Sequence, residues 1–177
     1  MHTLRTWLGS WRGRRRLARL PFITTTSTAN YYKVFTAPNP DIHAVIYNSD
    51  GDEVGTAIYA VSPLDDRVYV FAITIAEHFR RRGYATALLR YLANTYKQPI
   101  TAVHALFDAR PFWHASCRLA GAGLVITPPL SANAMESEAV RWEHLKPVAK
   151  RLERIITHRL CVQHEPWAVA VGRGFDV

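Results

Sequence analysis

The sequence has few cysteines and no long apolar run. Its two cysteines, Cys117 and Cys161, lie far apart among 177 residues and do not indicate a disulfide framework. No stretch approaches the roughly 18 unbroken apolar residues of a membrane-spanning helix, and the N-terminus has no apolar signal core. These absences predict a reducing, cytoplasmic setting.

Net positive charge is small outside the N-terminus. The formal net charge is +8, and residues 1–20 contain six arginines and no acid, which leaves +2 for the remainder. Tryptophans and leucines lie among these arginines at roughly helical spacing, so residues 1–21 are predicted to form a basic arm. Such an arm either binds nucleic acid or an acidic partner, or is a solvated leader.

The rest of the chain has the composition of a globular protein, with 49% hydrophobic and 20% charged residues overall. One domain is predicted over residues 22–177. Apolar and β-branched runs predict strands, and the turn-rich residues 48–52 predict that two of them form an antiparallel hairpin. The predicted strands cover a first region from 22 to 36, with its clearest run at 31–36, and then residues 42–48, 53–61, 68–75, about 100–106, 124–127 and 167–171.

Three segments have helical periodicity. The first covers about 85–96, with one apolar face formed by Ala85, Leu88, Leu89, Leu92 and Tyr96. The second lies near 110–120 and stops at Gly121 or Gly123. The third is an insertion at about 135–160, in which Pro147 breaks or kinks the helix. The predicted fold class is therefore α/β, with a mixed, mostly antiparallel sheet flanked by helices.

The segment between the strand at 68–75 and the first helix has the chemistry of a phosphate site. The first N–H groups of a helix are unpaired, and the helix dipole adds partial positive charge there. Gly83 lacks the Cβ that would hold a phosphate away from the backbone, and Arg80, Arg81 and Arg82 supply charged donors. The sequence therefore predicts that a phosphate binds at this turn.

The run from Ile73 to Leu89 resembles the central signature of the GNAT acyl-CoA-dependent N-acetyltransferases, in which an apolar strand precedes Gln/Arg-x-x-Gly-x-Gly/Ala and an amphipathic helix. The resemblance implies a strand that splays from its neighbour, where its main chain pairs with the pantetheine arm of acetyl-CoA and the helix amides hold the pyrophosphate. The cofactor-binding residues would be Ile73, Thr74, Ile75, Arg80, Arg81, Arg82, Gly83, Tyr84, Ala85, Thr86 and Arg110.

The resemblance extends more loosely to residues 110–122. Arg110 stands where the family usually has Asn, and Cys117 stands where it usually has the Tyr that protonates the departing thiolate. Cys117 is therefore either the general acid or a small buried side chain that only packs.

The general base has no clear candidate in the sequence. Some family members place a glutamate in the central strand, where this chain offers Tyr69 and no carboxylate. Tyr69 is therefore the second catalytic candidate beside Cys117. Nearby acids are equally turn or rim charges, and a water chain is the other option; these acids are Glu53, Asp65, Asp66 and Glu77.

The acceptor side is also unusual. The family usually has two helices after its first strand, yet few residues separate Phe35 from Ile42, so either these helices are missing or the strand numbering is off by one. The helical insertion would then wall the acceptor pocket or mediate homodimerisation. His158, Cys161 and His164 have the right chemistry for zinc but lack a partner cluster, so no metal is predicted.

The resemblance implies an enzyme that transfers an acetyl group from acetyl-CoA to a primary amine. The basic arm favours a macromolecular acceptor slightly, either a protein or an aminoacyl-tRNA. A small-molecule amine is the first alternative. A non-catalytic module that binds acyl-CoA or nucleic acid is the second.

Overall fold

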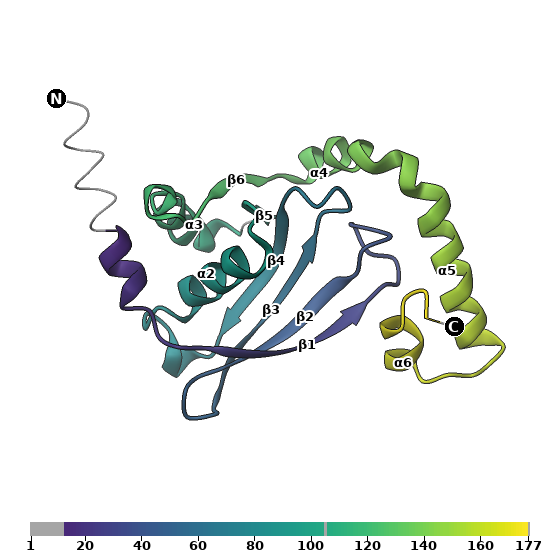
Figure 1. The fold of residues 1–177 in the computed structure, drawn as a ribbon, viewed down its shortest axis with the longest axis horizontal. Coiled ribbons are helices and arrows are strands. Elements are labelled where there is room, and N and C mark those ends of the chain that lie inside the picture. Colours follow the sequence, from purple (N-terminus) through teal and green to yellow (C-terminus); the bar gives the residue numbers. More distant parts are fainter. Residues whose placement is uncertain (1–12, 105, 177) are drawn as a thin grey trace.

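The computed structural model describes residues 13–104 and 106–176 and centres on a six-stranded sheet (Figure 1). The strands follow the chain order across the sheet: β1 (Thr24–Asn30), β2 (Asp41–Tyr47), β3 (Glu53–Val61), β4 (Val68–Ile75), β5 (Ile100–Val103) and β6 (Ile126–Leu130). Strands β1 to β4 are antiparallel, whereas β5 runs parallel to β4 and β6 runs parallel to β5. The predicted mixed, mostly antiparallel α/β sheet is confirmed.

Helices connect and flank the sheet. The α-helices are α2 (Tyr84–Tyr96), α3 (Arg110–Cys117), α4 (Ala132–Ala139), α5 (Lys146–Cys161) and α6 (Trp167–Gly172). Short 3-10 turns are η1 (Glu77–Phe79), η2 (Phe107–Ala109), η3 (Ala120–Ala122) and η4 (Val140–Leu145). None of the helices in the described part of the chain has the length and apolarity needed to span a membrane.

Strand alternation divides the apolar residues between the two faces of the sheet. Val68 and Val70 of β4 pack in the main core with Leu88 and Leu92 of α2, all of them buried. Tyr69 points to the other face, where it packs with Phe35, Trp142 and residues of α4. Helix α2 therefore covers one face, and α4 with η4 covers part of the opposite one.

The central antiparallel strands agree with the predicted ones. Strands β2, β3 and β4 match the predicted 42–48, 53–61 and 68–75, and the hairpin between β2 and β3 is confirmed. The side chain of Asn48 orders its turn, because its Oδ1 accepts hydrogen bonds from the N–H groups of Asp50 and Asp52, both at 2.9 Å. Gly55 lets β3 approach β4, since a Cβ there would lie 2.1 Å from the carbonyl oxygen of Thr74.

The predicted first strand region, 22–36, is confirmed only in its first part. The strand there is β1, whereas residues 31–36 belong to a loop that covers 31–40. The aromatic residues that suggested a strand instead enter two different clusters: Tyr31 and Tyr32 pack near Leu152, and Phe35 packs near Tyr69. Because no helix lies between β1 and β2, the two helices usual in the family are missing here.

The predicted last strand at 167–171 is wrong, because these residues form α6. A short apolar run does not distinguish a strand from a helix by its pattern alone. Pro166 caps the N-terminus of this helix. The buried guanidinium of Arg159 then donates to the carbonyl oxygens of Ala170 and Gly174, which anchors the segment against α5.

The remaining boundaries differ in detail. The predicted helix 135–160 consists of α4, η4 and α5, with Pro147 in the first turn of α5, where its missing N–H is harmless. Strand β6 continues through Pro128 and Pro129, which is tolerated because it is an edge strand. Strand β5 stops at Val103, short of the predicted 106.

Part of the predicted arm packs on the domain. Residues 13–18 are helical, Leu17 is buried in the main core, and the Arg90 guanidinium donates to the Leu17 carbonyl oxygen at 2.5 Å. Residues 1–12, which carry the rest of the predicted arm, lie outside the described residues.

Candidate functional site

Strands β4 and β5 separate after a short paired stretch. They pair from Val68 with Ile100 to Val70 with Ala102. Strand β4 then continues to Ile75, paired with β3 on one side and with no described strand on the other. A cavity of about 360 Å³ fills the gap and is lined by residues 70–75 of β4 together with residues of β5, α3 and the start of α2. The predicted splay of the central strand is therefore confirmed, and we call this cavity the wedge.

The main chain of β4 offers hydrogen-bonding groups to the wedge. The N–H of Ala76 donates to Val54 of β3 at 3.0 Å, so the alternating pattern turns Thr74 towards β3 and turns Ile73 and Ile75 away from it. The Nε of Arg80 donates to the Ile75 carbonyl oxygen at 3.0 Å, consistent with this direction. Among the three predicted positions, the main-chain N–H and C=O groups of Ile73 and Ile75 thus point to the wedge, whereas those of Thr74 point to β3.

The N-terminus of α2 opens at one end of the wedge, where Arg80 and Ala85 line the cavity. Arg81 and Arg82 are exposed around this turn, and Arg82 lies over the ring of Phe79. Thr86 is buried in the first turn. The first amides of α2 lack partners within the helix, so the turn has the donors and charge that a pyrophosphate needs.

Gly83 serves the fold as well as this turn. Its φ is 94°, in the left-handed region, which strains other residues. A Cβ there would meet Leu20 and Pro21 at 3.3 Å. Gly83 therefore does more than make room for a phosphate, because its missing side chain also lets the segment after the N-terminal helix pack closely against this turn.

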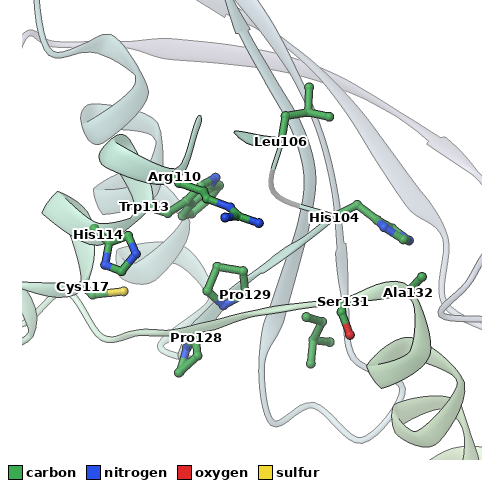
Figure 2. A pocket seen from close by; sticks show the side chains of 11 residues that line it. His104, Leu106, Arg110, Trp113, His114, Cys117, Pro128, Pro129, Ser131 and Ala132 are labelled. Atoms are coloured by element: carbon green, nitrogen blue, oxygen red, sulfur yellow. The ribbon is translucent and has the colours of Figure 1, made fainter. Parts of the chain in front are cut away.

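A second, larger cavity of about 820 Å³ adjoins the wedge and lies between α3, β6 and the start of α4 (Figure 2). One face of α3 lines it with Arg110, Trp113, His114 and Cys117, which follow the helical repeat. Arg110 is exposed, whereas Cys117 is partly buried. Both predicted residues therefore lie in the adjoining cavity rather than among those that line the wedge.

Tyr69 is not among the residues that line the wedge or the larger cavity. It is fully buried, and its hydroxyl donates to Glu138 Oε1 at 2.7 Å. Burial, followed by the contact with Glu138, raises the pKa of Tyr69 well above its ordinary value. Arg67 and Arg141 also bind Glu138, at 3.1 and 2.5 Å. Tyr69 thus joins β4 to α4 through a carboxylate that the sequence did not single out.

The four acids named as alternatives for the base lie elsewhere. Asp66 pairs with Arg141 and Arg67; although burial opposes it, the bond from Arg141 holds the pKa of Asp66 below its ordinary value. Glu53, Asp65 and Glu77 are exposed. None of these acids is among the residues that line either cavity.

His104 is the functional candidate that sequence reasoning missed. It follows the last residue of β5 and lines both cavities, and Figure 2 shows it across the larger one from α3. Of the residues that line the wedge, only Arg80 and His104 ionise, and an arginine does not give up its proton. His104 also has φ of 51°, uncommon for a residue other than glycine. A polar residue at the end of a buried strand was the available signal.

The possible zinc ligands do not assemble into a site. Within residues 13–104 and 106–176, no group of three or more His, Cys, Asp or Glu side chains is placed to hold a metal ion. His158, Cys161 and His164 therefore form no such set.

Comparison with known proteins places the chain by its sequence. The model of the acetyltransferase (GNAT) family matches residues 11–120, more than half of the chain. A solved protein assigned as an acetyltransferase from Deinococcus radiodurans R1 is 16% identical, with a TM-score of 0.37 over 59% of this chain and 82% of that one. Nourseothricin acetyltransferase is 19% identical, with a TM-score of 0.28 over 48% of this chain and 62% of that one. Among curated proteins, none matches significantly.

Proposed function

Because this chain belongs to the GNAT family of acyl-CoA-dependent N-acetyltransferases, we propose that it transfers the acetyl group of acetyl-CoA to a primary amine of a macromolecule, either a protein or an aminoacyl-tRNA. The observation that carries the donor side is the wedge between β4 and β5, which ends at the N-terminus of α2. The acceptor side rests on a different part of the sheet.

The residues present fit acetyl-CoA. Ile73 and Ile75 turn main-chain groups to the wedge, where an extended pantetheine arm would pair as an added strand does. The amides and arginines of residues 80–86 would hold the pyrophosphate, and Ala85 leaves room at the wall of the cavity. Arg110, at the start of α3, would add a cation from the adjoining cavity.

Acetyl-CoA supplies a thioester whose carbonyl carbon an amine can attack. In our proposal His104 accepts the proton of the acceptor ammonium, since a free amine is the nucleophile. The new carbon–nitrogen bond forms as the carbon–sulfur bond breaks, and the Cys117 thiol gives a proton to the departing sulfur. As the attacking nitrogen becomes an amide it loses a second proton, which restores the Cys117 thiol. Tyr69 contacts neither reactant and acts as a positioning residue, through its bond with Glu138.

The open sheet face supports a large acceptor. Cross-strand pairs align two rows on the face opposite α2: Thr28, His43, Ile58 and Ala72, and Thr26, Val45, Thr56 and Thr74. Both rows end on the part of β4 that lines the wedge. Every member is exposed except the half-buried Val45 and Ile58. An acceptor that approaches over this face meets an open surface, which suits a macromolecule better than a small molecule.

A small-molecule amine is the second candidate, and the cavity of about 820 Å³ favours it. A cavity of this size holds an ordinary small ligand. It joins the wedge through His104, Leu106 and Trp113, so an amine held there could approach the same donor site.

The test combines acetyl-CoA binding with CoA release. We expect acetyl-CoA to raise the melting temperature and CoA to appear faster with a lysine-containing protein or an aminoacyl-tRNA than with polyamines or aminoglycosides. Faster release with the small amines would favour the second candidate. Stabilisation by acetyl-CoA without release above background would leave only a binding module, and the absence of stabilisation would contradict the donor site.

A further inference from the structure

Helix α5 and the loop that follows it form a basic depression far along the chain from the wedge. Its volume is about 690 Å³, and its basic side chains are those of Arg151, Arg154, His158, Arg159 and Arg173. Figure 1 shows α5 running down one side of the molecule to α6, away from α2 and α3. This depression shares no described lining residue with the wedge or with the larger cavity beside it.

Charge is concentrated in this segment. Residues 146–176 contain six Lys or Arg and three Asp or Glu, a net +3, whereas residues 21–145 contain ten and eleven, a net −1. The body of the domain is therefore close to neutral. Outside the N-terminal arginines, the C-terminal segment is where positive charge gathers.

One wall of the depression is held in place. Arg159 is 3% exposed and donates to the carbonyl oxygens of Ala170, Gly174 and Asp176. Arg173 binds Oε1 of Glu165 at 2.9 Å. Among the described residues, Oε2 of this carboxylate has no hydrogen-bond partner, and Glu165 is the one acid that lines the depression. The charge of Glu165 is thus offset by Arg173, and Arg159 leaves this side with fixed positive charge.

The other wall is formed by exposed basic side chains of α5, and Lys150 extends their row beyond the depression. Lys150, Arg151, Arg154 and His158 are all exposed and fall within about 100° of the helix circumference. From Lys150 to His158 the row is about 12 Å long. Glu153, the only acid of α5, lies outside this arc. A single phosphate spans only part of such a row, whereas a polymer with repeated phosphates can contact all of it.

We propose that the α5 depression binds the phosphodiester backbone of a nucleic acid. Mobile Arg and Lys side chains on an open surface suit contacts to phosphates, which position a strand without reading its sequence. Binding is then expected to weaken steeply as salt rises, because each contact releases counterions. RNA and DNA share this backbone chemistry, and the experiment separates them.

The test uses the full chain and fluorescein-labelled oligonucleotides of about 20 residues, longer than the site of a typical single-strand binder. Oligouridine, oligothymidine and a DNA duplex are titrated by fluorescence anisotropy at several salt concentrations. We expect Arg151→Glu with Arg154→Glu to weaken binding at least tenfold. The slope of log affinity against log salt should fall by about 1.4 for a single strand, or about 0.7 for each lost contact.

The matched control is Lys97→Glu with Arg118→Glu, which makes the same change in net charge at two other exposed positions. The control should weaken binding less than threefold. An equal loss in both double variants, or none in the α5 variant, would overturn the proposal. Comparable binding of polyglutamate would also overturn it, since the surface would then select charge alone.

Fold and donor binding are measured alongside. Both double variants should keep the wild-type melting temperature and its increase with acetyl-CoA, because the substituted side chains are exposed and away from the wedge. If the glutamates disturb α5, Arg151→Gln with Arg154→Gln keeps the test open, with a smaller but measurable loss of affinity. Since acetyl-CoA binding is followed separately, failure of this proposal and failure of the proposed function are distinguishable.

Discussion

At the scale of single residues, His104 decides the proton chemistry that we propose for the wedge. His104→Gln removes the proton acceptor and keeps a polar side chain of similar size. We expect turnover to fall at least about 100-fold with acetyl-CoA affinity unchanged. His144→Gln, at an exposed histidine on η4, serves as the control, and wild-type turnover in His104→Gln would contradict the assignment.

A substitution of Cys117 distinguishes a catalytic role of its thiol from a role in packing alone. If its thiol returns the proton to the departing sulfur, Cys117→Ala should lower turnover about tenfold or more and leave the acetyl-CoA affinity unchanged. Steady-state kinetics and calorimetric binding of acetyl-CoA measure the two effects separately. Wild-type turnover would mean that Cys117 only packs against the wall of the larger cavity.

Asp41 makes the stability of the fold depend on pH. Burial raises the pKa of Asp41 to about 6, against a smaller lowering by His43, and its Oδ1 has no hydrogen-bond partner in the described part of the chain. The folded protein then holds a proton that the unfolded chain releases between about pH 4 and 6, so this group costs stability as pH rises through that range.

Asp41→Asn removes that cost. We expect the free energy of unfolding of the variant to exceed that of wild type by about 1–2 kcal/mol more at pH 8 than at pH 4, after allowance for partial exposure to water. Urea unfolding at the two pH values measures the difference. An advantage of the same size at both would mean that the carboxyl titrates in the folded protein as it does in the unfolded chain.

At the scale of elements, the junction of β4 and α2 carries the donor site that we propose. Ala85 is the better position for a test than Gly83, because Gly83 also has a left-handed φ and touches Leu20 and Pro21. Ala85→Glu adds a negative charge at the wall of the wedge, while an acid in the first turn favours the helix. We expect acetyl-CoA affinity to fall about 100-fold.

Ala85→Gln has nearly the same size without the charge and should lose less affinity than Ala85→Glu. Calorimetry measures both variants, and thermal unfolding without ligand checks the fold. Equal affinities of wild type and Ala85→Glu would place the pyrophosphate elsewhere.

At the scale of the whole molecule, the N-terminal segment belongs to the core. Because Leu17 is buried against α2, Leu17→Ala should lower the free energy of unfolding by about 2–3 kcal/mol. Arg16→Ala, at the exposed neighbour, should change it by less than about 0.5 kcal/mol. Urea denaturation measures both, and a negligible effect of Leu17→Ala would show that the segment is a solvated leader.

The elements that sequence predicted well are those with strong local patterns. The hairpin of β2 and β3, the apolar strand β4 and the amphipathic helix α2 each carry a period and a turn signal. The phosphate turn could be placed because it lies between two of them. Residues 31–36 and 167–171 misled because their aromatic and apolar side chains serve tertiary clusters, which short runs do not reveal.

The sequence by itself determined the family, and it placed a strand, a glycine turn and a helix in succession, which create unpaired amides through local geometry alone. Only the tertiary structure decided which side chains meet the wedge. His104 lines the wedge because β5 ends at Val103. Tyr69 is hydrogen-bonded to Glu138 of α4 on the other face of the sheet. Part of that face is exposed because no helix lies between β1 and β2. These relations join residues far apart in the chain, and only packing brings them together.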